Sequence, residues 1–276
     1  MMPRVLEKRH LTPITKLFVV EAPLVPRNAS PGQFVILRVN ESGERVPISI
    51  TDFDREAGTI TIVVQEVGKT TGLICALEEG DEILDFAGPL GRPAPLPESG
   101  NVILVGGGFG AGAVYPLARE LRRRGVRVTS IVGARNESLL ILRELLEPAS
   151  DEYHVCTDDG SVGYKGFVTG RLEELLVADG GFTHCFAIGP MAMMRAIAEV
   201  TGRFGLQTMV SLDPIMVDGT GMCGACRVTI DGATKFACVD GPFFDAHKVD
   251  FDEAVVRSKM YVDDEKRALE LAGARG

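Results

Sequence analysis

The chain has 276 residues, of which 45% are hydrophobic and 24% charged, and its formal net charge is −9. This length suits two or three domains with separate cores, and the negative charge excludes a nucleic-acid-binding protein because no basic stripe could neutralise a phosphate backbone. The apolar runs are broken by glycine and too short for a membrane span, and the N-terminus lacks the apolar core of a signal peptide, so we expect a cytoplasmic protein with no membrane span.

Residues 1–98 are predicted to form an antiparallel β-barrel. Short alternating or β-branched runs such as TITIVVQEV are separated by turn sequences such as SPG and EAG. Several strands at this spacing are typical of a small barrel. The segment GRPAPLPESG, with three prolines in ten residues, indicates the boundary that follows.

Two stretches of this barrel have residues that suit a flavin. A guanidinium fork matches two pyrophosphate oxygens, and a short hydroxyl can bond the edge of a flavin ring without crowding its face. A turn of glycine and threonine offers backbone and hydroxyl donors to phosphate. The first stretch is a predicted strand with the candidate residues Arg45, Val46, Pro47 and Ser49. The second is a predicted turn with the candidate residues Gly68, Lys69, Thr70 and Thr71.

Residues 99–212 alternate strand-like and helix-like segments, which predicts an α/β domain with a parallel sheet covered on both faces. The first strand runs into VGGGFGAGA, where Gly106, Gly108 and Ala111 form a G-x-G-x-x-A pattern before a helix. Glycine there lets phosphate oxygens approach bare N–H groups at a helix terminus. Because the pattern stands between a strand and a helix, it predicts dinucleotide binding.

Three further strand ends carry candidate nucleotide-binding residues, because ligands of parallel sheets bind outside the carboxyl ends of the strands. They are Arg135, then Asp158 and Asp159, then Gly189 and Pro190. An acidic residue that would hold a ribose hydroxyl is missing from the second strand end. Arg135 could bind a 2′-phosphate, contact adenine or pyrophosphate, or be a solvated surface arginine, so NAD and NADP both stay open.

Residues 213–276 contain a cysteine-rich loop and a charged helix. Asp218, Cys223, Cys226 and Cys238 have the spacing of a plant-type [2Fe–2S] loop with aspartate in the place of the first cysteine. Aspartate carries the same negative charge as a thiolate. A Cys3Asp zinc site and a metal-free cluster remain alternatives. The other cysteines, Cys75, Cys156 and Cys185, are isolated in apolar segments and are predicted to be core residues.

The order of barrel, nucleotide sheet and cysteine segment resembles the ferredoxin–NADP reductase superfamily. Two departures stand out: Arg45 precedes Ser49 by four residues where the superfamily has three, and Ile188 stands where many relatives carry cysteine. Nearly the whole chain is similar to electron-transfer subunits of dihydroorotate dehydrogenase and to small subunits of NADH-dependent ferredoxin–NADP oxidoreductases. The stretches DPIMVDGTGMCGACRVTI and TDDGSVGYKGFVT favour the second group, in which the position of Asp218 holds an aspartate ligand.

This resemblance implies an electron relay among NAD(H), FAD and a [2Fe–2S] cluster. It also implies a larger partner subunit with FAD and [4Fe–4S] clusters that binds NADP(H) and ferredoxin and performs electron bifurcation. A C-terminal helix over residues 252–272 is a candidate contact for that partner or a solvated terminal helix. The alternatives are the dihydroorotate-linked subunit and a zinc-bearing nucleotide-binding regulator.

Overall fold

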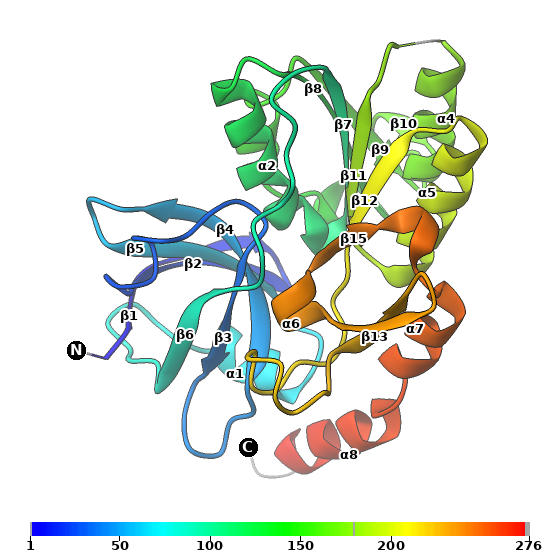
Figure 1. Cartoon of the computed structure of the whole chain (residues 1–276). Helices are drawn as coiled ribbons and strands as arrows, with labels where there is room; N and C mark the ends of the chain where they lie inside the picture. Colours follow the sequence, from blue (N-terminus) through cyan, green and yellow to red (C-terminus); the bar gives the residue numbers. More distant parts are fainter. Residues whose placement is uncertain (1, 179, 274–276) are drawn as a thin grey trace.

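The computed structural model describes residues 2–178 and 180–273. Two sheets and a C-terminal segment make up the molecule (Figure 1), with the first sheet at the left, the second above it and the C-terminal segment below. The predicted order of an antiparallel β unit, an α/β unit and a small cysteine-bearing segment is confirmed.

The first sheet is antiparallel and has the strand order β1-β2-β5-β4-β3-β6. Its strands are β1 (Arg4–Thr12), β2 (Thr15–Glu21), β3 (Phe34–Arg38), β4 (Val46–Asp54), β5 (Thr59–Gln65) and β6 (Asp85–Leu90). The edge strand β1 contacts the segment that leads into the other edge strand, β6: Val5 N donates to Asp81 O, and Arg4 forms a β-bridge with Glu82. Alternate side chains such as Phe18, Ile50 and Ile62 therefore point into one buried core.

The second sheet has the order β10-β9-β8-β7-β11-β12-β15. Its strands are β7 (Asn101–Gly107), β8 (Arg127–Ala134), β9 (Glu152–Thr157), β10 (Tyr164–Lys165), β11 (His184–Ile188), β12 (Gln207–Ser211) and β15 (Phe243–Asp245). All pairs are parallel except β12 with β15. The cysteine segment therefore adds an antiparallel edge strand that the sequence pattern did not indicate.

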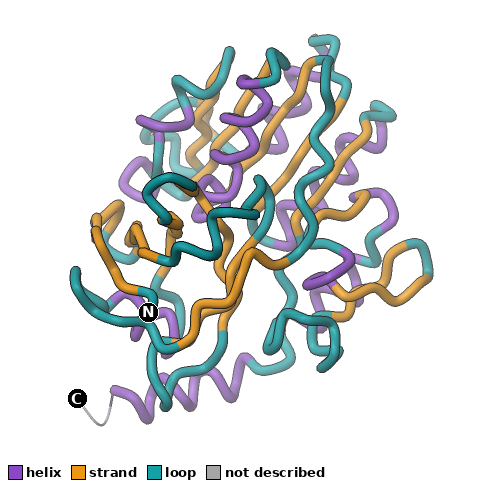
Figure 2. The backbone as a smooth tube through the Cα atoms, turned by 60° about the vertical axis from the view of Figure 1, so that its left-hand side comes forward, coloured by secondary structure: helices purple, strands orange, loops and turns teal. Residues whose placement is uncertain are grey.

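Helices cover both faces of this sheet (Figure 2). The helices are α2 (Ala111–Arg123), α3 (Arg143–Leu146), α4 (Val168–Val177) and α5 (Met191–Arg203). Both faces need cover because the strands are apolar on both sides. In β7, Val102 and Leu104 face the core under α2, while Ile103 and Val105 face the core under α4 and α5. The isolated cysteines Cys75, Cys156 and Cys185 are buried, as predicted.

Two helical segments differ from a continuous helix. Residues 138–147, SLLILRELLE, are one of the helix-like segments of the α/β domain, but they form part of a short 3-10 turn (Glu137–Leu139) and the four-residue α3. The helix is interrupted because Leu142 adopts φ 56° and both it and Ile141 are buried in the core. The helix predicted over residues 252–272 is two helices, α7 (Phe251–Ser258) and α8 (Val262–Gly273). The break lets α8 reach the barrel helix α1 (Lys69–Cys75).

The remaining elements are short. The hairpin β13 (Arg227–Ile230) and β14 (Ala233–Phe236) precedes α6 (Ala237–Asp240), and 3-10 turns cover Gly108–Gly110 and Ala246–Lys248. Within residues 2–178 and 180–273, no helix has the length and apolar character needed to cross a membrane.

The contribution of Glu120, on α2, to the stability of the fold should depend on pH. Hydrogen bonds from Arg123 and Arg124 lower its pKa from the ordinary 4.5 to about 2. Because the pKa is lower in the folded state, ionised Glu120 stabilises the fold fully above pH 4.5. This stabilisation is lost as the pH falls from 4.5 toward 2. We expect Glu120→Gln to lower the melting temperature at pH 7, and the gap to wild type to narrow by pH 3.

Thermal unfolding followed by circular dichroism at pH 7, 5 and 3 measures this gap. Glu147→Gln is the control, because Glu147 makes an ion pair of the same kind with Arg143 at an exposed position. A gap for Glu120→Gln that stays constant with pH would contradict the prediction.

Candidate functional site

Strand β4 carries the candidate flavin-binding side chains of the barrel. Ser49 is exposed and lies opposite Phe34 of β3, while Val46 and Pro47 lie opposite Leu37 and Ile36. Arg45 precedes the strand, and its Nη2 lies 3.3 Å from Asp85 Oδ2. Arg38 Nε donates to the same oxygen at 2.7 Å. Arg45 can therefore leave Asp85 to bind a phosphate, because Arg38 would still neutralise the Asp85 carboxylate.

The predicted turn at Gly68–Thr71 is the start of a helix. Gly68 is the N-cap of α1, and Lys69, Thr70 and Thr71 form its first turn. The first N–H groups of a helix have no partner within it and suit an anion. A Cβ on Gly68 would have no atom within 4 Å, so the approach to this end is open. Thr70 is buried, and its hydroxyl donates to Glu44 at 3.0 Å.

The glycine turn after β7 lies against the end of β11. A Cβ on Gly106 would lie 3.2 Å from Ala111 Cα, so this glycine allows the helix to lie close to its strand. A Cβ on Gly189 would lie 3.1 Å from the backbone of Gly107. Gly108 has φ +55° and open space beside it. The structure therefore brings Gly106, Gly108 and Gly189 together, with Pro190 as the N-cap of α5.

The ends of β8 and β9 lie at the same edge of the sheet. Asp158 N donates to Ala134 O at 3.1 Å and Asp159 N donates to Arg135 O at 3.2 Å. All three candidate side chains are exposed. Hydrogen bonds from Ser161 lower the pKa of Asp159. These side chains can meet a ligand that also lies on the glycine turn, because the carboxyl ends of parallel strands share one edge.

Two of the candidate metal ligands, Cys226 and Cys238, lie with their thiols together, and Asp218 is joined to Cys223 through the backbone of Cys223. Asp218 Oδ2 accepts from Cys223 N at 2.9 Å, and Cys226 Sγ lies 3.2 Å from Cys238 Sγ. Backbone N–H groups of Thr220 and Cys223 lower the pKa of Asp218, so it is ionised at neutral pH. Burial raises the pKa of the Cys238 thiol to about 12.

The four candidate ligands suit a [2Fe–2S] cluster in number and type, because such a cluster takes four protein ligands shared between two irons. In the part of the chain that the structure describes, no three His, Cys, Asp or Glu side chains are placed to hold one metal ion together. Gly219, Gly221 and Gly224 all have positive φ, which allows the loop to wrap closely around such a cluster.

The three candidate regions meet at the two barrel strands β3 and β4. A Cβ on Gly219, beside Asp218, would lie 2.7 Å from Ile36 Cδ1 and 2.7 Å from Leu90 Cδ1. On β4, Thr51 is two residues after Ser49, and a Cβ on Gly112 of α2 would lie 3.2 Å from its hydroxyl. The cysteine loop thus touches β3, and the first turn of α2 touches β4.

Several residues of these regions carry no motif that would identify them. Glu44 accepts a hydrogen bond from Thr70, and Asp85 pairs with Arg45 and also with Arg38. Met193 lies over Gly107 and Gly189, although its sequence position indicates only a helix-core residue. These contacts join residues that are distant in the chain, so spacing could not have revealed them.

Two glycines of the turn make a matched pair for a test. A Cβ on Gly110 would overlap the carbonyl of Ile188, whereas one on Gly108 would have no atom within 4 Å. We expect Gly110→Ala to destabilise the fold by about 3 kcal/mol. Gly108→Ala should cost only about 1 kcal/mol for the left-handed backbone. Urea unfolding of both variants measures the difference, and equal losses would contradict this packing.

Comparison with known proteins assigns the chain to a family. Residues 213–250 match the iron–sulfur cluster binding domain of dihydroorotate dehydrogenase B. A Thermotoga maritima homologue of the dihydroorotate dehydrogenase B (NAD(+)) electron transfer subunit is 46% identical, over 93% of this chain and 92% of its own. The corresponding subunit of Bacillus caldolyticus is 38% identical over 82% and 89%.

A solved structure agrees with this assignment. It is that of an NADH-dependent reduced ferredoxin–NADP oxidoreductase, studied for flavin-based electron bifurcation. It is 42% identical, covers 98% of this chain and 97% of the matched chain, and superposes with a TM-score of 0.93. The Amycolatopsis cytochrome P450 reductase GcoB is 25% identical, over 73% and 65%, with a TM-score of 0.62. The chain belongs to the family of dihydroorotate dehydrogenase B electron transfer subunits and their homologues, on a ferredoxin-reductase fold.

Proposed function

We propose that this protein is an oxidoreductase subunit that passes electrons between NAD(H), FAD and a [2Fe–2S] cluster. The observation that carries the proposal is the meeting of the three candidate regions at β3 and β4, with Thr51 against Gly112 and Ile36 against Gly219. When bound, FAD supplies the exchange of a two-electron hydride for single electrons, and the cluster supplies one-electron transfer.

The residues of the barrel would bind and orient the flavin. Arg45 would bind pyrophosphate oxygens, together with the open N–H groups after Gly68. Val46 and Pro47 would line the ring, and the exposed hydroxyl of Ser49 would bond its edge. None of these residues would transfer a proton. Their contribution would be to hold the flavin in one orientation that suits electron transfer.

The residues of the sheet would bind the nicotinamide nucleotide. The turn at Gly106–Ala111 would receive the phosphates, and Gly189 and Pro190 would flank the reacting end. Arg135, Asp158 and Asp159 would contact the adenosine half. NAD(H) is the proposed nucleotide, in agreement with the NADH-dependent enzyme that shares this fold at 42% identity. The arginine also suits a 2′-phosphate, so NADPH is the comparison to measure.

Asp218, Cys223, Cys226 and Cys238 would hold the cluster. The loop around them exposes Met222, whose exposed fraction is 88%, and Val217. We propose that the cluster serves a larger FAD and [4Fe–4S] subunit that binds NADP(H) and ferredoxin, with α8 as a second contact. The relatives named as subunits and the bifurcating enzyme support this partner. A cytoplasmic location is part of the same proposal.

A dihydroorotate-linked role is the second candidate, because the match over residues 213–250 is to a dihydroorotate dehydrogenase B domain. Asp218 distinguishes the two, since that resemblance implies four cysteines in the dihydroorotate-linked subunits. Isolation of the native complex from cells, followed by assays with dihydroorotate and with NADPH plus ferredoxin, separates them. Dihydroorotate oxidation by the complex would contradict the first proposal.

Substitution of Asp218 tests the cluster. In protein purified without oxygen and reduced by NADH, we expect wild type to contain two irons per chain and a rhombic EPR signal. Asp218→Cys should keep the iron and shift the signal, because a thiolate replaces an oxygen ligand. Asp218→Ala should lose iron. Asp231→Asn, in the exposed β13–β14 turn, is the control. An unchanged EPR signal in both Asp218 variants would show that this aspartate is not a ligand.

Substitution of Arg45 tests the flavin site. Arg45→Gln removes a charge-assisted phosphate contact while Asp85 retains Arg38, so we expect FAD to bind about tenfold more weakly with the fold intact. Equilibrium titration of flavin-free protein with FAD measures the affinity. Arg9→Gln, which removes an exposed arginine paired with Glu7, is the control. Equal affinities in the two variants would place the flavin elsewhere.

A further inference from the structure

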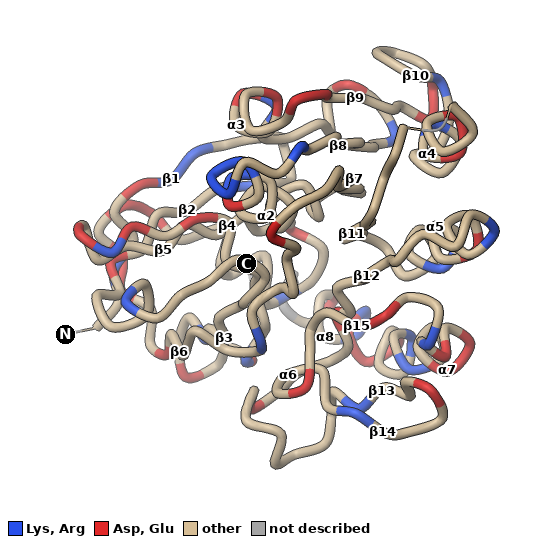
Figure 3. The backbone as a smooth tube through the Cα atoms, turned by 45° about the horizontal axis from the view of Figure 1, so that its top comes forward, with Lys and Arg blue, Asp and Glu red and all other residues tan. Residues whose placement is uncertain are grey.

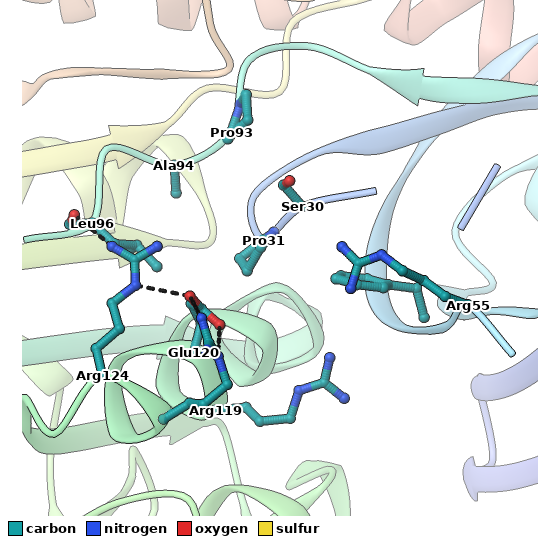
Figure 4. A pocket seen from close by; sticks show the side chains of 11 residues that line it. Ser30, Pro31, Arg55, Pro93, Ala94, Leu96, Arg119, Glu120 and Arg124 are labelled. Carbon is teal, nitrogen blue, oxygen red and sulfur yellow. Dashed lines mark hydrogen bonds and ion pairs between the residues drawn. The ribbon is translucent and has the colours of Figure 1, made fainter. Parts of the chain in front are cut away.

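A cavity of about 650 Å³ lies at the junction of the barrel and the sheet, away from every residue proposed above to bind a cofactor. Four parts of the chain form its wall (Figure 4): the loop at Ser30 and Pro31, the end of β4, the connector from Pro93 to Leu96, and the second half of α2. Its volume is in the range of small-molecule sites. A ligand bound here would touch both domains and the connector.

Four of the eleven residues that line this cavity are arginines. Arg55, Arg119, Arg123 and Arg124 line it, with Glu120 as the one acidic residue of the wall. Figure 3 shows the same basic segment on α2, in a chain whose net charge is −9. Such a concentration of guanidinium groups in an acidic protein favours an anionic ligand.

The arginines retain donors for a ligand. Arg55 donates to Ala29 O at 2.9 Å, and within residues 2–178 and 180–273 it has no carboxylate at ion-pair distance. A guanidinium has five donors, so most of those on Arg55 remain available. Its Cζ lies 4.8 Å from the centre of the Phe53 ring, and that of Arg119 lies 5.5 Å from the same ring. The aromatic ring therefore holds two guanidinium groups at one side of the cavity.

The acidic residues nearby position the arginines and do not fill the cavity. Asp52 binds Arg119. Glu120 accepts from Nε and Nη2 of Arg123 and from Nε of Arg124, each at 2.8 Å. Glu98 accepts from Arg124 Nη1 at 2.8 Å. A guanidinium has five N–H donors, so each of these arginines keeps donors that no carboxylate binds. The opposite wall is apolar, with Pro31, Pro93 and Ala94.

We propose that this cavity binds a phosphate-bearing small molecule, with its phosphate on Arg55, Arg119 and Arg123 and its organic part against the proline wall. Guanidinium groups recognise phosphate through paired N–H donors. The bound molecule would link the barrel to α2 at a distance from the redox groups. This inference does not depend on the proposed electron transfer.

Calorimetric titration of the flavin- and iron-loaded protein, with saturating NAD+ present to occupy the proposed nucleotide site, tests the proposal with two probes, inorganic pyrophosphate and ADP. We expect both to bind and ADP to bind more tightly, because only ADP can use the apolar wall. Arg55→Gln should weaken both by about tenfold or more. Arg143→Gln, which removes an exposed arginine on α3 outside the cavity, should bind like wild type.

A second variant protects the test against misfolding. Arg123 has an exposed fraction of 74% and pairs only within its own helix, so Arg123→Gln should fold normally and also weaken both probes. Pyrophosphate binding equal to that of ADP would assign the site to free phosphates and overturn the role of the apolar wall. Titration curves that are the same in wild type, Arg55→Gln and Arg123→Gln would overturn the site itself and leave these arginines as a structural contact.

Discussion

The packing of Gly219 on Ile36 and Leu90 holds the cysteine loop against the barrel, and the proposed electron transfer depends on this position of the loop. Glycine is strongly favoured there, because its φ is +76° and a Cβ would lie 2.7 Å from the terminal methyl group of each of the two side chains. Electron transfer between a flavin and a cluster requires the two groups to be close. The contact holds the loop of Asp218 and Cys223 on β3, next to the strand that carries Ser49, and so places the two candidate sites side by side.

The same barrel strands also face the nucleotide turn. Gly112, in the first turn of α2, lies against Thr51, and the ion pair between Asp52 and Arg119 continues the contact along the helix. Strand β15 adds a third connection, because it ties the cysteine segment to β12 of the nucleotide sheet. The two sheets and the cysteine segment are thus joined by contacts at β3, β4 and β12.

Local patterns in the sequence predicted much of this arrangement. Alternation with period two indicated the barrel strands, and the G-x-G-x-x-A turn after β7 indicated its helix, because both depend on neighbours in the chain. The start of α1 was missed because Gly68 and two threonines are also typical of turns. The break at residues 259–261 was missed because nothing in that charged segment differs from a continuous helix. The long-range contacts Gly219–Ile36 and Arg45–Asp85 follow from packing, which spacing does not encode.

The most direct test of the central contact is the iron content and the NADH-driven EPR signal of Gly219→Ala, measured beside Gly232→Ala. Both changes place alanine at positive φ, but a Cβ at Gly232 has no atom within 4 Å. We predict that Gly219→Ala keeps its flavin and loses iron or reduces its cluster more slowly, while Gly232→Ala behaves like wild type. Full iron occupancy with wild-type reduction in Gly219→Ala would contradict the account.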